Sequence, residues 1–179
     1  MNTKISICLV FCIALIIGCS KDSPVKESAQ SEQSSDVSNA KKATRVSGIA
    51  YYADATECDY EGKGATYATK MTGDLEGCYY VWIDEYHCSG DGNYFEKGHE
   101  LFVGTYKGQP GSFQTTYRFV AKFPGCKDGG PMGIEIFGLC QHPIVEGSGD
   151  GVFAGVTGIL HFWDNIPAGK FPYRGQLRF

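Results

Sequence analysis

The sequence lacks any apolar run long enough to cross a bilayer as a helix, which needs about 20 consecutive apolar residues. Its longest run, from Ile5 to Ile17, follows a single lysine, Lys4, and gives way to a polar stretch from Ser20. A short apolar segment with a basic start and small residues at its end is typical of a secretory leader. We therefore expect residues 1–18 to be a signal peptide rather than an anchor helix.

Three other patterns are missing from the rest of the chain. No window of about a dozen residues shows the apolar repeat of a helix with capping residues at its ends, which argues against a helical domain. No glycine-rich stretch ends in Gly-Lys-Ser or Gly-Lys-Thr, which excludes a P-loop. No Gly-x-Ser-x-Gly elbow and no Cys-His pair at a familiar spacing occur, so nothing supports covalent catalysis.

Basic residues are also too few for a nucleic-acid partner. From residue 46 onward the chain has 16 Asp and Glu against 10 Lys and Arg, which leaves a clear negative charge. Residues 19–45 are mostly Ser, Lys, Glu, Gln and Asn with almost no large apolar side chain. Because such a segment cannot offset its own ordering entropy, we expect a disordered tether before a single domain at residues 46–179.

The leader ends in Ile16-Ile17-Gly18-Cys19, which resembles the lipobox of bacterial lipoproteins. The second isoleucine departs slightly from the lipobox, where a small residue is commoner at that position. The resemblance implies cleavage before Cys19 and a lipid on its thiol, with enough acyl chains for stable membrane anchoring. Ser20 rather than Asp after the cysteine favours the outer membrane by the same resemblance.

The domain alternates apolar and polar residues with a period of two, as strands with one buried face do. The clearest case is SFQTTYRFVAKF, residues 112–123, which forms a long hairpin with the preceding HELFVGTY through the turn KGQPG. The expected strands lie near residues 46–52, 65–72, 77–87, 93–106, 112–123, 132–142, 156–163 and 171–178. About eight antiparallel strands favour a closed β-barrel, which leaves no exposed edge, with a β-sandwich as the alternative.

Glycines cluster in GSGDGVFAGVTGILHF, residues 147–162. They are Gly147, Gly149, Gly151, Gly155 and Gly158. A dinucleotide-binding fingerprint needs a helix directly after its glycines, but branched and aromatic residues and then Pro167 follow here. We therefore expect structural glycines, which let the backbone turn sharply at a barrel corner.

This stretch, continued by FPYRGQL, resembles the glycine-rich closing segment of the allene oxide cyclase-like barrel family, which includes the plant dirigent proteins. The match covers about residues 138–179, and it implies a calycin-like barrel of about eight strands. The family's cyclases bind a fatty-acid epoxide inside the barrel, and its dirigent members steer the coupling of phenoxy radicals. Family members of the cyclase type often form oligomers, so the resemblance is compatible with an oligomer. No functional residue of either group matches a position of this chain.

The mature domain keeps an odd number of cysteines, so an exported protein would hold disulfides and one free thiol. If Cys78 and Cys88 bracket one strand, they lie about 33 Å apart, beyond the reach of a bridge. Counting strands up and down the barrel places Cys58 and Cys126 at the same end as Cys88, with Cys140 nearer to Cys78. We predict the bridges Cys88–Cys126 and Cys78–Cys140, with Cys58 free.

Two carboxylates stand in the aromatic stretch GCYYVWIDEYHC. Alternation puts Asp84 on the same face as Tyr80 and Trp82, and Glu85 on the opposite face. A carboxylate inside an aromatic lumen would have a raised pKa and could act as an acid or base. Asp84 and Glu85 are therefore the catalytic candidates, with ordinary surface placement as the alternative. Glu135, between two isoleucines, is expected to face solvent.

The remaining site candidates are side chains that could meet a ligand inside the barrel or at its mouth. They are Tyr80, Trp82, Tyr117, Phe119, Tyr173 and Arg174. Cys140 and His142 share a strand face, but two ligands do not make a metal site and the other histidines show no ligand spacing. We predict no metal and no cofactor.

The leading hypothesis is a non-catalytic outer-membrane lipoprotein whose barrel binds a small apolar or amphipathic ligand. An alternative is a cyclase or isomerase-type enzyme acting on a lipid-like substrate, favoured by a cavity with a carboxylate and a polar neighbour. A third is a protein-binding envelope module that uses loops such as CKDGGPMG, residues 126–133. A filled barrel core with one apolar loop patch would favour that module.

Overall fold

The computed structural model describes residues 42–179, which form an antiparallel β-barrel without an α-helix. Its strands are β1 (Thr44–Tyr52), β2 (Tyr67–Gly73), β3 (Leu75–Cys88), β4 (Asn93–Tyr106), β5 (Gln109–Lys122), β8 (Phe137–Pro143), β10 (Thr157–Trp163) and β11 (Phe171–Arg178). They pair in the order β1-β2-β3-β4-β5-β8-β10-β11, and β11 returns to pair with β1. The closed barrel predicted from the sequence is thus confirmed, and the β-sandwich alternative is wrong. The predicted signal peptide, the lipid site Cys19 and most of the tether lie outside the described residues.

Short elements at the two ends of the barrel escaped the sequence analysis. A small hairpin, β6 (Gly125–Lys127) and β7 (Gly130–Met132), ends where the strand predicted at residues 132–142 was expected to begin, and β8 starts only at Phe137. The short strand β9 (Asp150–Gly151) pairs with the start of β5, and a single turn of 3₁₀ helix, η1 (Ile166–Ala168), precedes β11. Strands of two or three residues rich in glycine carry no readable alternation.

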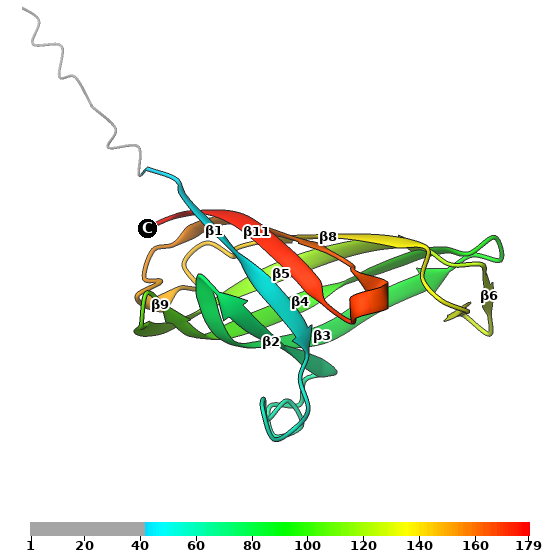
Figure 1. The fold of residues 1–179 in the computed structure, drawn as a ribbon, viewed down its shortest axis with the longest axis horizontal. Helices are drawn as coiled ribbons and strands as arrows, with labels where there is room; N and C mark the ends of the chain where they lie inside the picture. Colours follow the sequence, from blue (N-terminus) through cyan, green and yellow to red (C-terminus); the bar gives the residue numbers. More distant parts are fainter. Residues whose placement is uncertain (1–41) are drawn as a thin grey trace, which may run out of the picture. The chain divides into compact units, whose positions relative to one another are not determined.

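The barrel has two different ends, with β9 and the C-terminus at one and β6 at the other (Figure 1). At the β9 end the interior is filled by aromatic rings packed around Phe153, which is fully buried. Its ring centroid lies 5.0 Å from that of Phe113, 5.6 Å from Phe102, 6.4 Å from Tyr106 and 6.2 Å from Phe179. We call this region the closed end.

The glycine-rich segment carries Phe153 into the closed end. Gly147, Gly151 and Gly155 have φ values of 77°, 60° and 70°, a left-handed conformation that side chains other than glycine rarely adopt. At Gly149 a Cβ atom would collide with the backbone of Phe153. These four glycines, with Gly158 against β11, therefore have the structural role expected from the sequence.

One of the two predicted disulfides is wrong. Cys78 pairs with Cys58, with a Cα–Cα distance of 5.8 Å, and Cys140 is left as a buried free thiol. The reason is the long loop between β1 and β2, residues 53–66, which folds back over the outer face of the barrel. Cys58 and Cys78 pack there with Tyr80 in a second, smaller hydrophobic cluster. Strand counting could not anticipate a loop that returns along the barrel wall.

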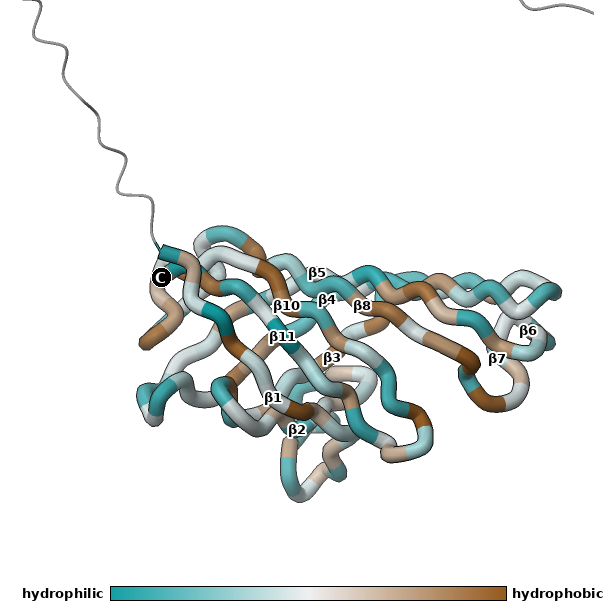
Figure 2. Tube along the Cα trace, turned by 45° about the horizontal axis from the view of Figure 1, so that its top comes forward, coloured by the Kyte–Doolittle hydropathy of each residue, from teal (hydrophilic) through white to brown (hydrophobic). Residues whose placement is uncertain are grey.

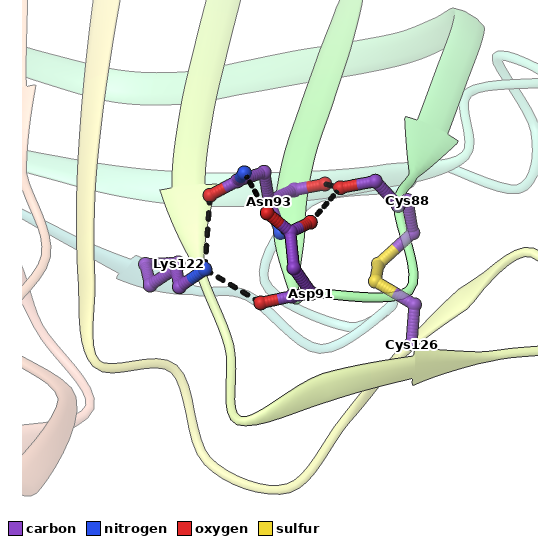
Figure 3. Close-up of a disulfide and its surroundings, with 6 residues drawn as sticks. Cys88, Asp91, Asn93, Lys122 and Cys126 are labelled. Carbon is purple, nitrogen blue, oxygen red and sulfur yellow. Dashed lines mark hydrogen bonds between the residues drawn. A yellow bond between two sulfur atoms is a disulfide. The ribbon is translucent and has the colours of Figure 1, made fainter.

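The other predicted disulfide, Cys88–Cys126, is present and joins the end of β3 to β6 (Figure 3). Beside it, Lys122 Nζ donates to Asn93 Oδ1 at 3.0 Å and to the carbonyl oxygen of Asp91 at 2.5 Å. Asn93 Nδ2 in turn donates to Asp91 Oδ2 at 2.6 Å. The bridge thus ties β6 to the end of β3, and the Lys122 hydrogen bonds tie the end of β5 to the start of β4, at what we call the open end.

Candidate functional site

The open end leads into a cavity of about 340 Å³ inside the barrel. Nine of the 19 residues that line it are tyrosine or phenylalanine: Tyr52, Tyr67, Tyr79, Tyr94, Tyr117, Phe119, Phe123, Phe162 and Phe171. Its titratable polar side chains, apart from the tyrosines and Cys140, are Glu96, Glu100, Glu135, Asp164 and His142. Among the described residues that line it there is no lysine or arginine.

Strand alternation places two glutamates of β4 inside the barrel. Glu96 and Glu100 are four residues apart, so they project to the same face as Phe102 of the closed end. Glu96 is 8% exposed and Glu100 is 3% exposed. The sequence analysis missed both, although their even spacing from Phe102 was a readable signal.

Glu100 is the centre of a buried hydrogen-bond cluster. Its Oε2 atom accepts from Tyr79 Oη at 2.7 Å and from Thr115 Oγ1 at 2.6 Å, and it lies 2.7 Å from His142 Nδ1. Burial and then the Glu100 charge raise the pKa of Tyr79 well above its ordinary value, which keeps its hydroxyl protonated as a donor. We call these four side chains the Glu100 cluster.

His142 has one ring nitrogen left over. His142 is 5% exposed, and its Nε2 atom is buried without a hydrogen-bond partner. A neutral imidazole that donates from Nδ1 to a carboxylate carries its lone pair on Nε2. In that tautomer the ring offers a hydrogen-bond acceptor in the wall of the cavity, oriented by Glu100.

Glu96 has two tyrosine partners closer to the mouth of the cavity. Tyr117 Oη donates to Oε1 at 2.7 Å, and Tyr94 Oη donates to Oε2 at 2.5 Å. Burial, then the hydrogen bond to Glu96, raises the pKa of both tyrosines. These hydroxyls satisfy the carboxylate of Glu96 without neutralising its charge.

Glu135 and Asp164 face each other over Gly138, where a Cβ atom would collide with both carboxyl groups. Burial, followed by the Asp164 charge, raises the pKa of Glu135 to about 8, and burial also raises the pKa of Asp164. Glu135 Oε1 is buried without a partner. The expectation that Glu135 faces solvent is wrong, because residues 133–136 are not in a strand and alternation does not apply there.

Two of the six ligand-binding candidates from the sequence, Tyr117 and Phe119, line the cavity. Tyr80 and Trp82 share one face of β3 as predicted, but that face is the outer one, where Tyr80 belongs to the cluster beneath residues 53–66. Their assignment to the ligand site is therefore corrected.

The other two candidates lie in β11, away from the cavity wall. Tyr173 is buried in the core, where its hydroxyl accepts from the backbone N–H of Leu75 at 3.0 Å. Arg174 is exposed, with its guanidinium 5.9 Å from the ring centroid of Trp163. Neither residue lines the cavity described above.

The catalytic candidates Asp84 and Glu85 are on the surface of the barrel. Asp84 Oδ1 lies 3.0 Å from His99 Nδ1, and Glu85 Oε2 lies 2.6 Å from Lys97 Nζ, with all four side chains about half exposed. A β-bulge at Asp84 shifts the register, so that both carboxylates end on the outer face. Surface placement, the alternative reading, is the one the structure gives.

Apolar side chains also gather outside the barrel near the open end. Figure 2 shows hydrophobic stretches along β8 and the loop that leads into it. Those that are well exposed are Met132, Ile134, Ile136, Phe137 and Leu139. Since the barrel is hollow at this end, only one of the two features expected of a protein-binding module, the apolar loop patch, is present.

Within residues 42–179, no group of three or more His, Cys, Asp and Glu side chains is arranged to hold a metal ion. In the same part of the chain no helix has the length and hydrophobicity needed to span a membrane. No protein-family model matches the sequence, and no curated protein matches it significantly.

Proposed function

We propose that this protein is a membrane-anchored lipoprotein whose barrel binds a small amphipathic ligand in the cavity at the open end. The observation that carries the proposal is the cavity itself, with aromatic walls and a few converging polar groups. Small-molecule sites in proteins are usually built in this way. Because aromatic rings fill the closed end, the ligand would enter and leave through the open end.

The lipid anchor rests on the lipobox resemblance of Ile16-Ile17-Gly18-Cys19. A lipid on Cys19 would hold the barrel beside the outer membrane, where amphipathic molecules are concentrated. Replacing Cys19 by serine should move the protein from the membrane fraction to the soluble fraction and remove the mass of the lipid. Retention of the Cys19→Ser variant in the membrane would contradict the anchor.

Native mass spectrometry on the full chain, purified after exposure to a mixture of fatty acids, phenols and amines, tests ligand binding. We expect a stoichiometric adduct that is released on unfolding. Ile83→Trp should reduce the adduct, because Ile83 lines the cavity, whereas Ile134→Trp at a 74% exposed position should keep it. A bare mass for the unsubstituted protein would refute the proposal.

The Glu100 cluster favours a second candidate, an acid–base enzyme of the cyclase or isomerase type. His142 combines an available acceptor nitrogen with a carboxylate that orients its ring, which is the arrangement of a general base. The test is to recover the bound compound and compare its chromatographic retention before and after incubation. Conversion by the unsubstituted protein, lost in His142→Gln while binding remains, would support catalysis. Recovery of the unchanged compound would contradict catalysis and would indicate a carrier.

A further inference from the structure

We propose that the cavity selects amphipathic ammonium compounds, which present N–H donors on a short apolar body, over carboxylates of the same size. This inference rests on the proposed ligand-binding function and adds the chemical class of the ligand. It differs from the fatty-acid type of ligand that the family resemblance implies. It is argued from four properties of the cavity: its charge, its unpartnered polar atoms, the Glu135–Asp164 pair and the rings at its mouth.

The charge of the cavity wall is one-sided. Four carboxyl groups line it, and His142 is the one side chain among the described lining residues that can carry a positive charge. The hydroxyl partners of Glu96 and Glu100 are neutral donors, so they stabilise these carboxylates without cancelling their charge. A ligand carboxylate would be desolvated beside other carboxyl groups, with no lysine or arginine in the cavity wall to pair with it, which is unfavourable.

The polar atoms of the site that lack a partner would be satisfied by a hydrogen-bond donor on the ligand. His142 Nε2 and Glu135 Oε1 are both buried without a partner. Nε2 accepts a hydrogen bond when the ring proton is on Nδ1, and a carboxyl oxygen accepts one whenever it does not itself carry the proton. The third such atom in the cavity wall, Thr69 Oγ1, can donate or accept. An unsatisfied buried acceptor is costly, and a ligand N–H group removes that cost.

The Glu135–Asp164 pair is the position where the ammonium group of the ligand would bind. The two carboxyl groups converge over Gly138, and burial, followed by the Asp164 charge, raises the pKa of Glu135. A cation between them would favour the ionised form of Glu135 and would pair with both groups.

Rings at the mouth complete the environment for a cation. Tyr52 meets Tyr67 and Phe171 edge to face, with ring centroids 5.5 Å and 4.9 Å apart. Aromatic rings next to carboxylates recognise organic cations through cation–π attraction.

The test is calorimetric titration of the full chain carrying Cys19→Ser, which removes the predicted lipid so that the buffer needs no detergent. Four probes share one hexyl chain and differ in their head group: hexylammonium, hexanol, hexyltrimethylammonium and hexanoate. We expect hexylammonium to bind about tenfold more tightly than hexanol, which lacks the charge, and than hexyltrimethylammonium, which lacks N–H donors. Hexanoate should bind weakest.

A matched pair of variants assigns the preference to the cavity. Glu135→Gln should remove most of the difference between hexylammonium and hexanol while leaving the affinity for hexanol nearly unchanged. Glu146→Gln, an exposed position outside the cavity, should behave like the parent protein. Equal losses of affinity for all probes in Glu135→Gln would show a general disturbance of the site and overturn the assignment.

The outcomes separate this inference from the function on which it rests. Binding of hexanoate as tight as that of hexylammonium would overturn the ammonium preference and keep the ligand-binding function. Equal binding of hexylammonium and hexyltrimethylammonium would overturn the need for N–H donors. Failure of all four probes, which share their hydrocarbon chain, would count against ligand binding itself.

Discussion

The closed and open ends are built from the same strands, yet one is filled and the other is hollow. On the inner face of β4, Phe102 lies at the closed end and Glu96 and Glu100 lie toward the open end. On β5, Phe113 packs against Phe153, whereas Tyr117 bonds to Glu96. The backbone pairing of β4 and β5 is continuous from one end to the other, so the difference comes from the inward side chains and from the glycine-rich segment that places Phe153 in the closed end. A barrel of this kind concentrates packing energy at one end and leaves polar chemistry at the other.

The largest effect is expected at the centre of the closed end. Phe153→Ala should lower the free energy of unfolding by about 3–5 kcal/mol, because it leaves a void among four rings and little can collapse into it. Phe137→Ala, at a 59% exposed position near the open end, should change stability by less than about 0.5 kcal/mol. Denaturant unfolding measures both. Equal losses would show that the two ends do not divide stability as described.

Loss of the Cys88–Cys126 bridge should have the next largest effect. The bridge closes a chain separation of 38 residues, and the double serine variant should lose about 2–4 kcal/mol. The matched variant without Cys58–Cys78, with a separation of 20, should lose roughly 0.5 kcal/mol less. Hydrogen exchange in the β6–β7 hairpin should accelerate in the first variant more than exchange around Phe153. Equal acceleration at both ends would contradict the local role of the bridge.

A smaller effect is expected where the glycine-rich segment turns. Gly151→Ala should cost about 1–3 kcal/mol, since φ there is 60° and the new Cβ would collide with the carbonyl oxygen of Pro110. Gly90→Ala, at a position with open space around it, should stay within about 0.5 kcal/mol of the parent protein. Thermal unfolding of the two variants compares them. If Gly151→Ala does not change the stability, the segment that forms the closed end does not require glycine at this position.

The smallest effect is a pH dependence at the open end. The pKa of Glu135 is about 8 in the folded protein against 4.5 ordinarily, so the folded state holds this proton more tightly than the unfolded state. Its contribution to stability is therefore full below pH 4.5 and is lost as the pH rises to about 8. Melting temperatures at pH 5 and pH 8 should differ less in Glu135→Gln than in the parent protein or in Glu146→Gln. An unchanged difference would show that Glu135 is not the group responsible.

The strands were predictable because alternation is strong where one face of a strand is buried and the other is wet. The strand predicted at residues 112–123 shows this well, since Phe113, Thr115 and Tyr117 are buried and the residues between them are exposed. In β3 alternation does not distinguish the two faces, because the consecutive residues Cys78, Tyr79, Tyr80 and Val81 are all buried. The loop at residues 53–66 covers the outer face, so both faces of β3 are apolar and sequence alone could not tell inside from outside.

The site was less predictable than the fold for a related reason. Its acids come from β4, from the loop before β8 and from the end of β10, and only the closed barrel brings them together. Aromatic neighbours drew attention to Asp84 and Glu85, whereas a β-bulge decides where those side chains point. Glu96 and Glu100 share the parity of Phe102, and that parity is the signal on which a closer sequence interpretation could have relied.

The seam between β1 and β11 has a consequence for the order of folding. Thr44 pairs with Leu177 and Ala50 pairs with Phe171, so the first and last strands of the barrel are neighbours across nearly the whole domain sequence. Contacts between such distant residues form slowly, because the entropy of a long stretch of chain is lost before these contacts contribute any stability. The hairpin of β4 and β5 can form early from local contacts, but the barrel stays an open, curled sheet until its last strand arrives. Synthesis must therefore be essentially complete before the protein acquires an interior.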